Sequence, residues 1–230
     1  MTASSRWKHR LHILRRIASK SFYRLLGVWN KRLQPREVFF IKAGYHHAAT
    51  AESFDDTAGN DEFQRSVYEL AATLMGQYNY ASIVDVGCGS AYKLINMLGE
   101  HRTIGIEVEP TYSWLLNKYP ARKWLFYDPS GMPALKADIV ICSDVIEHIN
   151  HPDELMDFLS TIDFNLLIIS TPERDKICGQ NDYGPPENTS HYREWNSSEF
   201  KLYTGKWFKI DEHHTYNDRS ITQVIVCSKM

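Results

Sequence analysis

Residues that could bind a small polar ligand follow an apolar, β-branched run near position 85. Ile83 and Val84 lead into Asp85, and Gly87 and Gly89 come next, before a pattern that starts a helix. This order predicts a strand, a glycine turn and a helix. The glycines accept positive φ and let the backbone approach a ligand, while the helix N-terminus offers unpaired N–H groups. An acid at this place suits an ammonium group and would repel a pyrophosphate.

The glycine spacing argues against the common nucleotide-binding loops. The dinucleotide fingerprint needs a third glycine three residues after the second, and Tyr92 holds that position. The sequence contains no Gly-Lys-Ser/Thr run that would form a phosphate-binding loop. The motif Asp85-Val86-Gly87-Cys88-Gly89 instead resembles the first motif of the class I S-adenosylmethionine-dependent methyltransferases. The resemblance implies that S-adenosylmethionine is the cofactor and that this acid and turn meet its methionine end.

Two further acids end predicted strands. Residues 103–107 form a second strand that ends in Glu107, 18 residues beyond Gly89. An acid at the end of the second strand of a βαβ unit can hold a ribose diol by two hydrogen bonds, and the matching acid of the family does this for the cofactor's ribose. Asp128 ends the third strand (123–128), where the resemblance implies a contact with the adenine amine. A turn-capping role before the following Pro-Ser-Gly has equal weight.

A second motif lies over residues 137–149. A buried strand ends in Ser143 and Asp144 and continues into Glu147-His148. This run resembles the fourth-strand motif of small-molecule methyltransferases. The resemblance implies that Ser143 and Asp144 line the cofactor.

Two histidines are candidates for the catalytic base. Methyl transfer from a sulfonium to an oxygen is an in-line displacement, so the protein has to orient the acceptor and take its proton. A histidine suits the second task, and the candidates are His148, after the fourth strand, and His191, in a loop expected to cover the site. Each has a structural alternative, in which Glu147-His148 braces the loop and His191 orders it beside Arg193. Arg193 is also a candidate for holding an anionic acceptor.

The residues around this loop indicate the class of acceptor. Thr171-Pro172-Glu173-Arg174, Gly184-Pro185-Pro186-Glu187-Asn188, and His191 with Arg193-Glu194-Trp195 resemble a branch of the family that methylates quinone-type, sugar or other small hydroxyl acceptors. The resemblance implies a small-molecule or glycan hydroxyl. A protein or RNA acceptor, or a non-catalytic cofactor-binding scaffold, are the alternatives. The acidic charge of the catalytic part disfavours nucleic acid, because binding phosphates needs the reverse charge.

The elements that position these residues alternate as strand and helix. The alternation predicts an α/β fold with a doubly wound, mostly parallel sheet, and the resemblance implies seven strands with a C-terminal antiparallel pair. We expect this pair over 207–210 and 221–227, with His213-His214 at the surface between them. Before the glycine turn, residues 61–78 predict a helix capped by Asp61.

Charge divides the chain of 230 residues into an arm and one globular domain. Residues 1–36 hold ten Lys or Arg and no acid, which leaves 16 basic residues against 28 acidic ones in the remainder. Within 1–33, apolar residues at steps of three and four predict a basic amphipathic helix. Such a helix lies on an anionic membrane surface, packs on the protein or a partner, or serves as a transit peptide. Residues 34–230 form the predicted methyltransferase domain, in which 34–62 include a loop over the site.

Cysteine and histidine spacing argue against a metal site. Four scattered cysteines without Cys-x-x-Cys spacing indicate reduced thiols in the cytoplasm, with neither a disulfide framework nor a zinc site. The neighbours His46 and His47 would point to opposite faces of an extended chain. No apolar run is long enough to span a bilayer. We therefore expect no metal and a cytoplasmic protein that is peripheral at a membrane if the arm binds there; the oligomeric state stays open.

Overall fold

The computed structural model describes residues 38–52, 56–58, 63–217 and 219–230, together with 18, 21, 22, 25 and 26. The predicted arm helix therefore lies almost entirely outside the described residues, and its membrane binding and the cytoplasmic location stay predictions. Among the described helices, none is long and apolar enough to cross a membrane.

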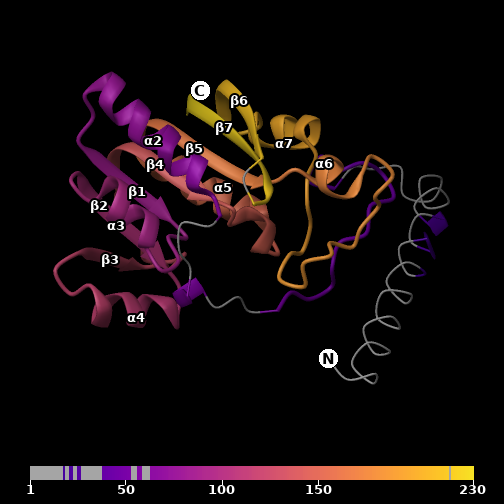
Figure 1. The fold of residues 1–230 in the computed structure, drawn as a ribbon, viewed down its shortest axis with the longest axis horizontal. Helices are drawn as coiled ribbons and strands as arrows, with labels where there is room; N and C mark the ends of the chain where they lie inside the picture. The colour runs from indigo at the N-terminus through magenta and orange to yellow at the C-terminus, as the bar shows by residue number, and fades with distance from the viewer. Residues whose placement is uncertain are drawn as a thin grey trace.

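Within the described residues, seven strands form one sheet in the order β3-β2-β1-β4-β5-β7-β6 (Figure 1). The strands are β1 (Ser82–Val86), β2 (Arg102–Glu107), β3 (Lys123–Phe126), β4 (Lys136–Ser143), β5 (Asp163–Pro172), β6 (Phe208–Asn217) and β7 (Ile221–Lys229). All neighbours pair in parallel except β7, which is antiparallel to β5 and β6. The predicted fold class is confirmed. Because the strand order reverses between β1 and β4, the chain leaves their carboxyl ends in opposite directions and opens a crevice there.

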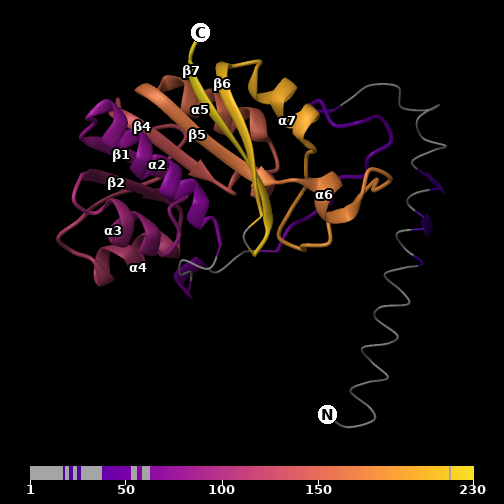
Figure 2. The same ribbon diagram turned by 45° about the horizontal axis from the view of Figure 1, so that its top comes forward.

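Helices cover both faces of the sheet, because successive side chains of a strand point to opposite sides. The helices are η1 (Asp56–Ala58), α2 (Arg65–Tyr78), α3 (Tyr92–Leu98), α4 (Thr111–Lys118), η2 (Ile146–His148), α5 (Pro152–Thr161), α6 (Arg174–Cys178) and α7 (Ser197–Thr204). Ile83 of β1 packs in the layer with α2, α3 and α4, whereas Val84 packs in the layer with α5 and α7 (Figure 2). Burial on both faces accounts for the nearly continuous apolar runs of the central strands.

The helix before β1 begins later than predicted. It starts at Arg65, after Gln64, whose φ of 62° is left-handed and whose side chain makes no capping bond. A left-handed residue interrupts the right-handed backbone of a helix, so α2 cannot continue backwards through it. The predicted cap, Asp61, lies outside the described residues.

Strand β6 is longer than predicted and contains both histidines that we placed between strands. His213 pairs with Ile225 and His214 with Val224 of β7. β6 lies at the edge of the sheet, where polar side chains are favoured over a regular apolar alternation. The apolar run that identifies the inner strands is therefore missing over the second half of β6.

The segment 38–45 contributes two side chains to the core. Ile41 is 1% exposed and Tyr45 is 8% exposed, and both pack in the layer with Trp195. The indole N–H of Trp195 donates to the carbonyl oxygen of Phe39 at 2.9 Å. This segment and the chain between α6 and α7 run beside each other at one side of the sheet (Figure 1). Together they cap the molecule next to the crevice.

A buried ion pair joins the two helices of this cap. Arg174, which is fully buried, donates to both carboxylate oxygens of Glu199 at 2.7 and 3.0 Å. Glu199 also accepts the backbone N–H of Lys42 at 2.9 Å. The pair therefore holds α6, α7 and the N-terminal part of the cap in one arrangement.

We expect the Arg174→Met variant to lose about 3 kcal/mol of unfolding free energy, because the Glu199 carboxylate would stay buried without its cation. Lys136→Ala is the matched control: Lys136 forms a 2.7 Å pair with Asp163 in which both side chains are largely exposed. Its removal should cost at most about 1 kcal/mol. Urea unfolding of the three proteins measures the difference, and equal losses for the two variants would contradict the assignment.

Candidate functional site

A cleft of about 460 Å³ opens at the carboxyl ends of β1, β2 and β4. Its lining includes Ala51, Glu52, Asp56, Gly87, Cys88, Gly89, Lys93, Glu107, Tyr127, Ser143, Asp144, Val145, His148, Glu154, Ser190 and Tyr192. These residues come from the strand ends, from α3, η2 and α5, from the segment before α2 and from the loop before α7. Most of the predicted cofactor residues, though not Asp85 or Asp128, therefore line the crevice expected from the strand order.

The glycine turn after β1 lies closely against the turn after β4. Gly87 has φ +73° and Gly89 has φ +55°, in the left-handed region that favours glycine. A Cβ at Gly87 would lie 2.4 Å from Cγ2 of Val145, and one at Gly89 would lie 3.1 Å from Cβ of Asp56. Side chains at either position would close this floor of the cleft.

Glu107 stands at the end of β2 and lines the cleft. Its Oε1 accepts the N–H of Gly89 at 2.6 Å, and its Oε2 accepts the N–H of Val108 at 3.0 Å. Burial raises the pKa of this carboxyl to about 7, and the two N–H donors oppose the rise. Glu107 therefore both holds the glycine turn and presents a carboxylate to the cleft.

Asp85 lies beneath the turn and is fully buried. The hydroxyl of Tyr68 donates to its Oδ2 at 2.8 Å, while Oδ1 has no hydrogen-bond partner among the described residues. Burial raises the pKa of Asp85 to about 7, against the lowering effect of the Tyr68 hydroxyl and of Lys93. A cationic or N–H group that reached Oδ1 would stabilise the ionised form of this carboxyl.

The end of β4 supplies Ser143 and Asp144, and both line the cleft as expected. The Ser170 hydroxyl donates to Oδ1 of Asp144 at 2.6 Å and accepts its backbone N–H at 3.1 Å. Asp144 has φ +52°, so the chain turns sharply there into η2. Burial raises the pKa of Asp144.

Asp128 is not among the described residues that line the cleft. Its Oδ1 accepts both the backbone N–H and the hydroxyl of Ser130, at 2.9 and 2.7 Å, and these bonds lower the pKa of Asp128. The side chain of Asp128 thus caps the turn that follows β3, which is the alternative role given above for this residue. Tyr127, one residue earlier, lines the cleft instead. A local hydrogen bond within a turn has taken the side chain that a ligand contact would need.

His148 ends η2 and lines the cleft. Its Nδ1 lies 2.9 Å from the carbonyl oxygen of Ser190. A carbonyl oxygen only accepts, so Nδ1 carries the proton and Nε2 carries the lone pair. Burial lowers the pKa of His148 to about 4, with a smaller contribution from His191, so the ring is neutral at pH 7.

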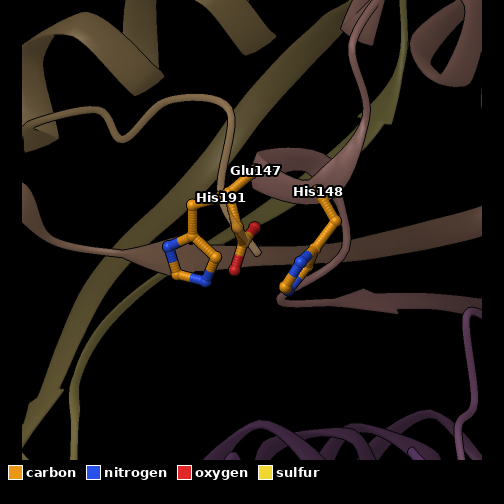
Figure 3. A group of neighbouring side chains, drawn as sticks. All are labelled: Glu147, His148 and His191. Carbon is orange, nitrogen blue, oxygen red and sulfur yellow. The ribbon is translucent and has the colours of Figure 1, made fainter. Parts of the chain in front are cut away.

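His191 lies behind His148 and is 6% exposed. Its Nδ1 is 2.7 Å from a carboxylate oxygen of Glu194, and its Nε2 is 2.9 Å from the side-chain nitrogen of Asn188. The Asn188 amide is oriented by Ser190, whose N–H donates to Oδ1. The two imidazole rings meet edge to face at 4.7 Å between centroids (Figure 3). Of the two histidines, only His148 is among the described lining residues.

Arg193 is not among the described residues that line the cleft. Its guanidinium donates to the carbonyl oxygens of Ile149 and Asn150, and its Nε donates to Nδ1 of His47 at 3.3 Å. The residue is 2% exposed, so the structure gives it the role of a clamp between η2 and the cap. The buried guanidinium donates its hydrogen bonds to nearby backbone carbonyls instead of to a ligand. The sequence pattern alone does not show that these carbonyls lie within reach.

Two chain segments cover the cleft, as predicted for the loop before α2 and the loop before α7. Ala48 N–H donates to the carbonyl of Tyr192, and Glu52 N–H donates to the carbonyl of Thr189. Tyr192 N–H in turn donates to the carbonyl of Glu147. The cover is thereby tied directly to the turn that carries His148.

The chain is similar to known enzymes in both sequence and fold. The family model described as "Methyltransferase domain" matches residues 49–223. No curated protein sequence matches the chain.

Solved structures with the same fold include three methyltransferases. Magnesium protoporphyrin IX methyltransferase from Synechocystis PCC 6803, solved with bound S-adenosylhomocysteine, is 18% identical; the match covers 73% of this chain and 83% of that one, with a TM-score of 0.55. 1,6-Didemethyltoxoflavin-N1-methyltransferase from Burkholderia thailandensis is 16% identical; the match covers 73% of this chain and 80% of that one, with a TM-score of 0.54. An S-adenosylmethionine-dependent methyltransferase from Clostridium acetobutylicum ATCC 824 is 12% identical; the match covers 74% of this chain and 95% of that one, with a TM-score of 0.56.

The raised pKa of Asp85 predicts a pH-dependent stability. The carboxyl titrates near 3.8 when exposed and near 7 when folded, so between these values the native state binds more protons than the unfolded state. Its contribution to stability therefore falls as the pH rises from 4 to 7, by up to about 1.4 kcal/mol per pH unit. The Asp85→Asn variant lacks this loss and should gain on the wild type as the pH rises. Unfolding curves of both proteins at pH 5 and pH 8 test this, and a constant difference would contradict it.

Proposed function

We propose that this chain, which belongs to the class I S-adenosylmethionine-dependent methyltransferase family, methylates a hydroxyl group of a small molecule or a glycan. Membership follows from the family model, which spans most of the chain, and S-adenosylmethionine is the cofactor. The observation that carries the choice of acceptor is the neutral imidazole of His148, which faces the cleft with its lone pair on Nε2.

The residues around the glycine turn fit this cofactor. Gly87 and Gly89 leave a cradle that a Cβ would fill, and the unpartnered Oδ1 of Asp85 suits the cofactor's ammonium group. Glu107, at the end of β2, suits the ribose diol. Ser143 and Asp144, at the end of β4, also line the cleft and would contact the same ligand. The cofactor supplies a methyl group on a sulfonium, which is already an excellent leaving group.

The protein's own task is to hold the acceptor and to receive its proton. His148 lines the cleft near the cover, and the Ser190 carbonyl fixes both its orientation and its tautomer. An acceptor hydroxyl beside Nε2 would lose its proton to this nitrogen as the oxygen takes the methyl group. His191 has both ring nitrogens in hydrogen bonds and acts as a positioning residue rather than as the base.

The charge of the cleft supports a neutral acceptor. Among the described lining residues five are acids, Glu52, Asp56, Glu107, Asp144 and Glu154, whereas Lys93 is the one Lys or Arg. These carboxylates would repel a phosphate-rich acceptor. A sugar or phenol hydroxyl carries no such penalty.

Cofactor binding tests the site. We expect calorimetry to show tight binding of S-adenosylmethionine, which Asp85→Ala and Glu107→Ala each weaken by about tenfold or more, roughly 1.4 kcal/mol. Asp128→Ala is the matched control, because Ser130 engages the Asp128 carboxylate within its own turn, so its loss should leave the affinity unchanged. Failure of the folded wild-type chain to bind the cofactor would contradict the proposed function.

A second measurement tests the acceptor and the base. With S-adenosylmethionine and a panel of sugars, phenols and quinols, we expect S-adenosylhomocysteine to form with at least one hydroxyl compound. His148→Ala should slow this transfer by about a hundredfold while cofactor affinity is kept, and His151→Ala should not change it. Methylation of RNA or protein alone would reject the proposed acceptor class.

A further inference from the structure

Glu147, His148 and His191 meet at the wall of the cleft in a cluster of three ligand-type side chains. One ligand atom from each lies within 4.8 Å of the other two. Figure 3 shows the carboxylate of Glu147 next to the two imidazole rings. η2 and the loop before α7 thus bring together residues that are 43 positions apart, which sequence spacing did not indicate.

Both imidazoles are held in the way that metal-bound histidines are held. The Nδ1 of His148 donates to the Ser190 carbonyl, and the Nδ1 of His191 donates to the Glu194 carboxylate. A histidine anchored through Nδ1–H carries its lone pair on Nε2, and such outer partners fix the ring and raise its basicity as a ligand. Two of these pairs side by side point to a ligand that accepts lone pairs.

The third member of the cluster has an oxygen that nothing in the described structure satisfies. Glu147 is fully buried; its Oε2 accepts the Thr171 hydroxyl at 3.0 Å, while Oε1 has no hydrogen-bond partner among the described residues. Buried carboxylate oxygens are ordinarily paired with a donor or a cation. A cation between Oε1 and the imidazoles would satisfy it.

For a cation to enter, the Asn188 amide must give up two hydrogen bonds, the one to His191 and the one from the Ser190 N–H. The Asn188 side-chain nitrogen donates to Nε2 of His191. Asn188 is exposed, so its amide can rotate and bind water instead. The other hydrogen bonds of the cluster, from Thr171, to Ser190 and to Glu194, can remain as they are.

We propose that Glu147 Oε1, His148 Nε2 and His191 Nε2 bind one divalent transition-metal ion. Two imidazole nitrogens and one carboxylate suit Mn²⁺, Fe²⁺, Co²⁺ or Zn²⁺, whereas Mg²⁺ and Ca²⁺ prefer oxygen ligands. This differs from the absence of a metal expected from the sequence. Three protein ligands leave coordination positions open, as in catalytic rather than structural sites.

The task of the ion rests on the proposed function. His148 is the member that lines the cleft, so the ion would face the acceptor hydroxyl and lower its pKa. The hydroxyl proton is then lost to water, the oxygen bonds the methyl carbon, and the carbon–sulfur bond breaks with its electron pair on sulfur. In the metal-bound enzyme His148 is a ligand, and the base role described above belongs to the metal-free protein.

Metal binding by the full chain tests the proposal directly. Protein stripped with a chelator is titrated separately with Mn²⁺, Co²⁺, Zn²⁺, Mg²⁺ and Ca²⁺, and bound metal is measured by elemental analysis and calorimetry. We expect one transition-metal ion per chain, a visible absorption band for bound Co²⁺, and binding of Mg²⁺ and Ca²⁺ that is weaker by about tenfold or more. Wild-type protein that binds no transition metal would overturn the site.

Variants assign the ligands. Glu147→Gln and His191→Gln should each weaken Co²⁺ binding by at least about tenfold, since the loss of an outer partner alone has that effect. His151→Gln, an exposed histidine outside the cluster, should bind as the wild type does. Thermal melting confirms that each variant is folded, and unchanged Co²⁺ affinity in folded Glu147→Gln and His191→Gln would overturn the assignment.

The role of the ion is separated from the proposed function by two measurements on metal-free protein. Retained S-adenosylmethionine binding, with methyl transfer that is slow in the metal-free protein and faster after Mn²⁺ or Co²⁺ is added, supports both proposals. Transfer at the same rate with and without metal overturns the role of the ion and leaves the hydroxyl methyltransferase intact. Loss of cofactor binding by the wild type, with or without metal, rejects the proposed function alone.

Discussion

The close approach of two turns determines the rest of the site. The turn after β1 and the turn after β4 touch at Gly87 and Val145, where a Cβ would lie 2.4 Å from a methyl group. Only a residue without a side chain allows the two central strands to end this close together. The approach lets the Gly89 N–H reach Glu107, and it places the sharp bend at Asp144 at the edge of the cleft. The cleft and the position of η2 therefore depend on one backbone contact.

The same arrangement concentrates buried acids in a small volume. Asp85, Glu107, Asp144 and Glu147 all have a raised pKa, and burial is the largest cause in each case. Desolvated carboxyls of this kind cost folding free energy and are typical of functional sites, where a ligand completes their interactions. In this protein two of them have an orphan oxygen among the described residues: Asp85, beneath the glycine turn, and Glu147, in the histidine cluster. These are the places of the two ligands proposed above, the cofactor and the metal ion.

The sequence predicted the parts of this arrangement that depend on local pattern. Apolar strands followed by acids and the glycine turn after β1 are set by neighbouring residues, and the structure contains them. Asp128 and Arg193 lay beyond this reasoning, because a turn hydroxyl and two carbonyls compete for their side chains. The Glu147, His148 and His191 cluster arises when a loop folds back on η2. No spacing rule describes contacts between segments brought together by tertiary structure, and for the same reason the exposed edge strand β6 was predicted too short.

The cap makes the folding unit longer than the region shared with the family. The family match begins at residue 49, yet Ile41 and Tyr45 are buried in the core and the Phe39 carbonyl receives the indole N–H of Trp195. A fragment cut at the family boundary would expose Trp195 and remove the Lys42 N–H from Glu199. Residues 38–48, which precede the family match, therefore pack against the loop before α7 and support the cover of the cleft. The packing of the cover therefore depends on both segments, so exchange of this cover between relatives would have to include residues 38–52 as well as the loop before α7.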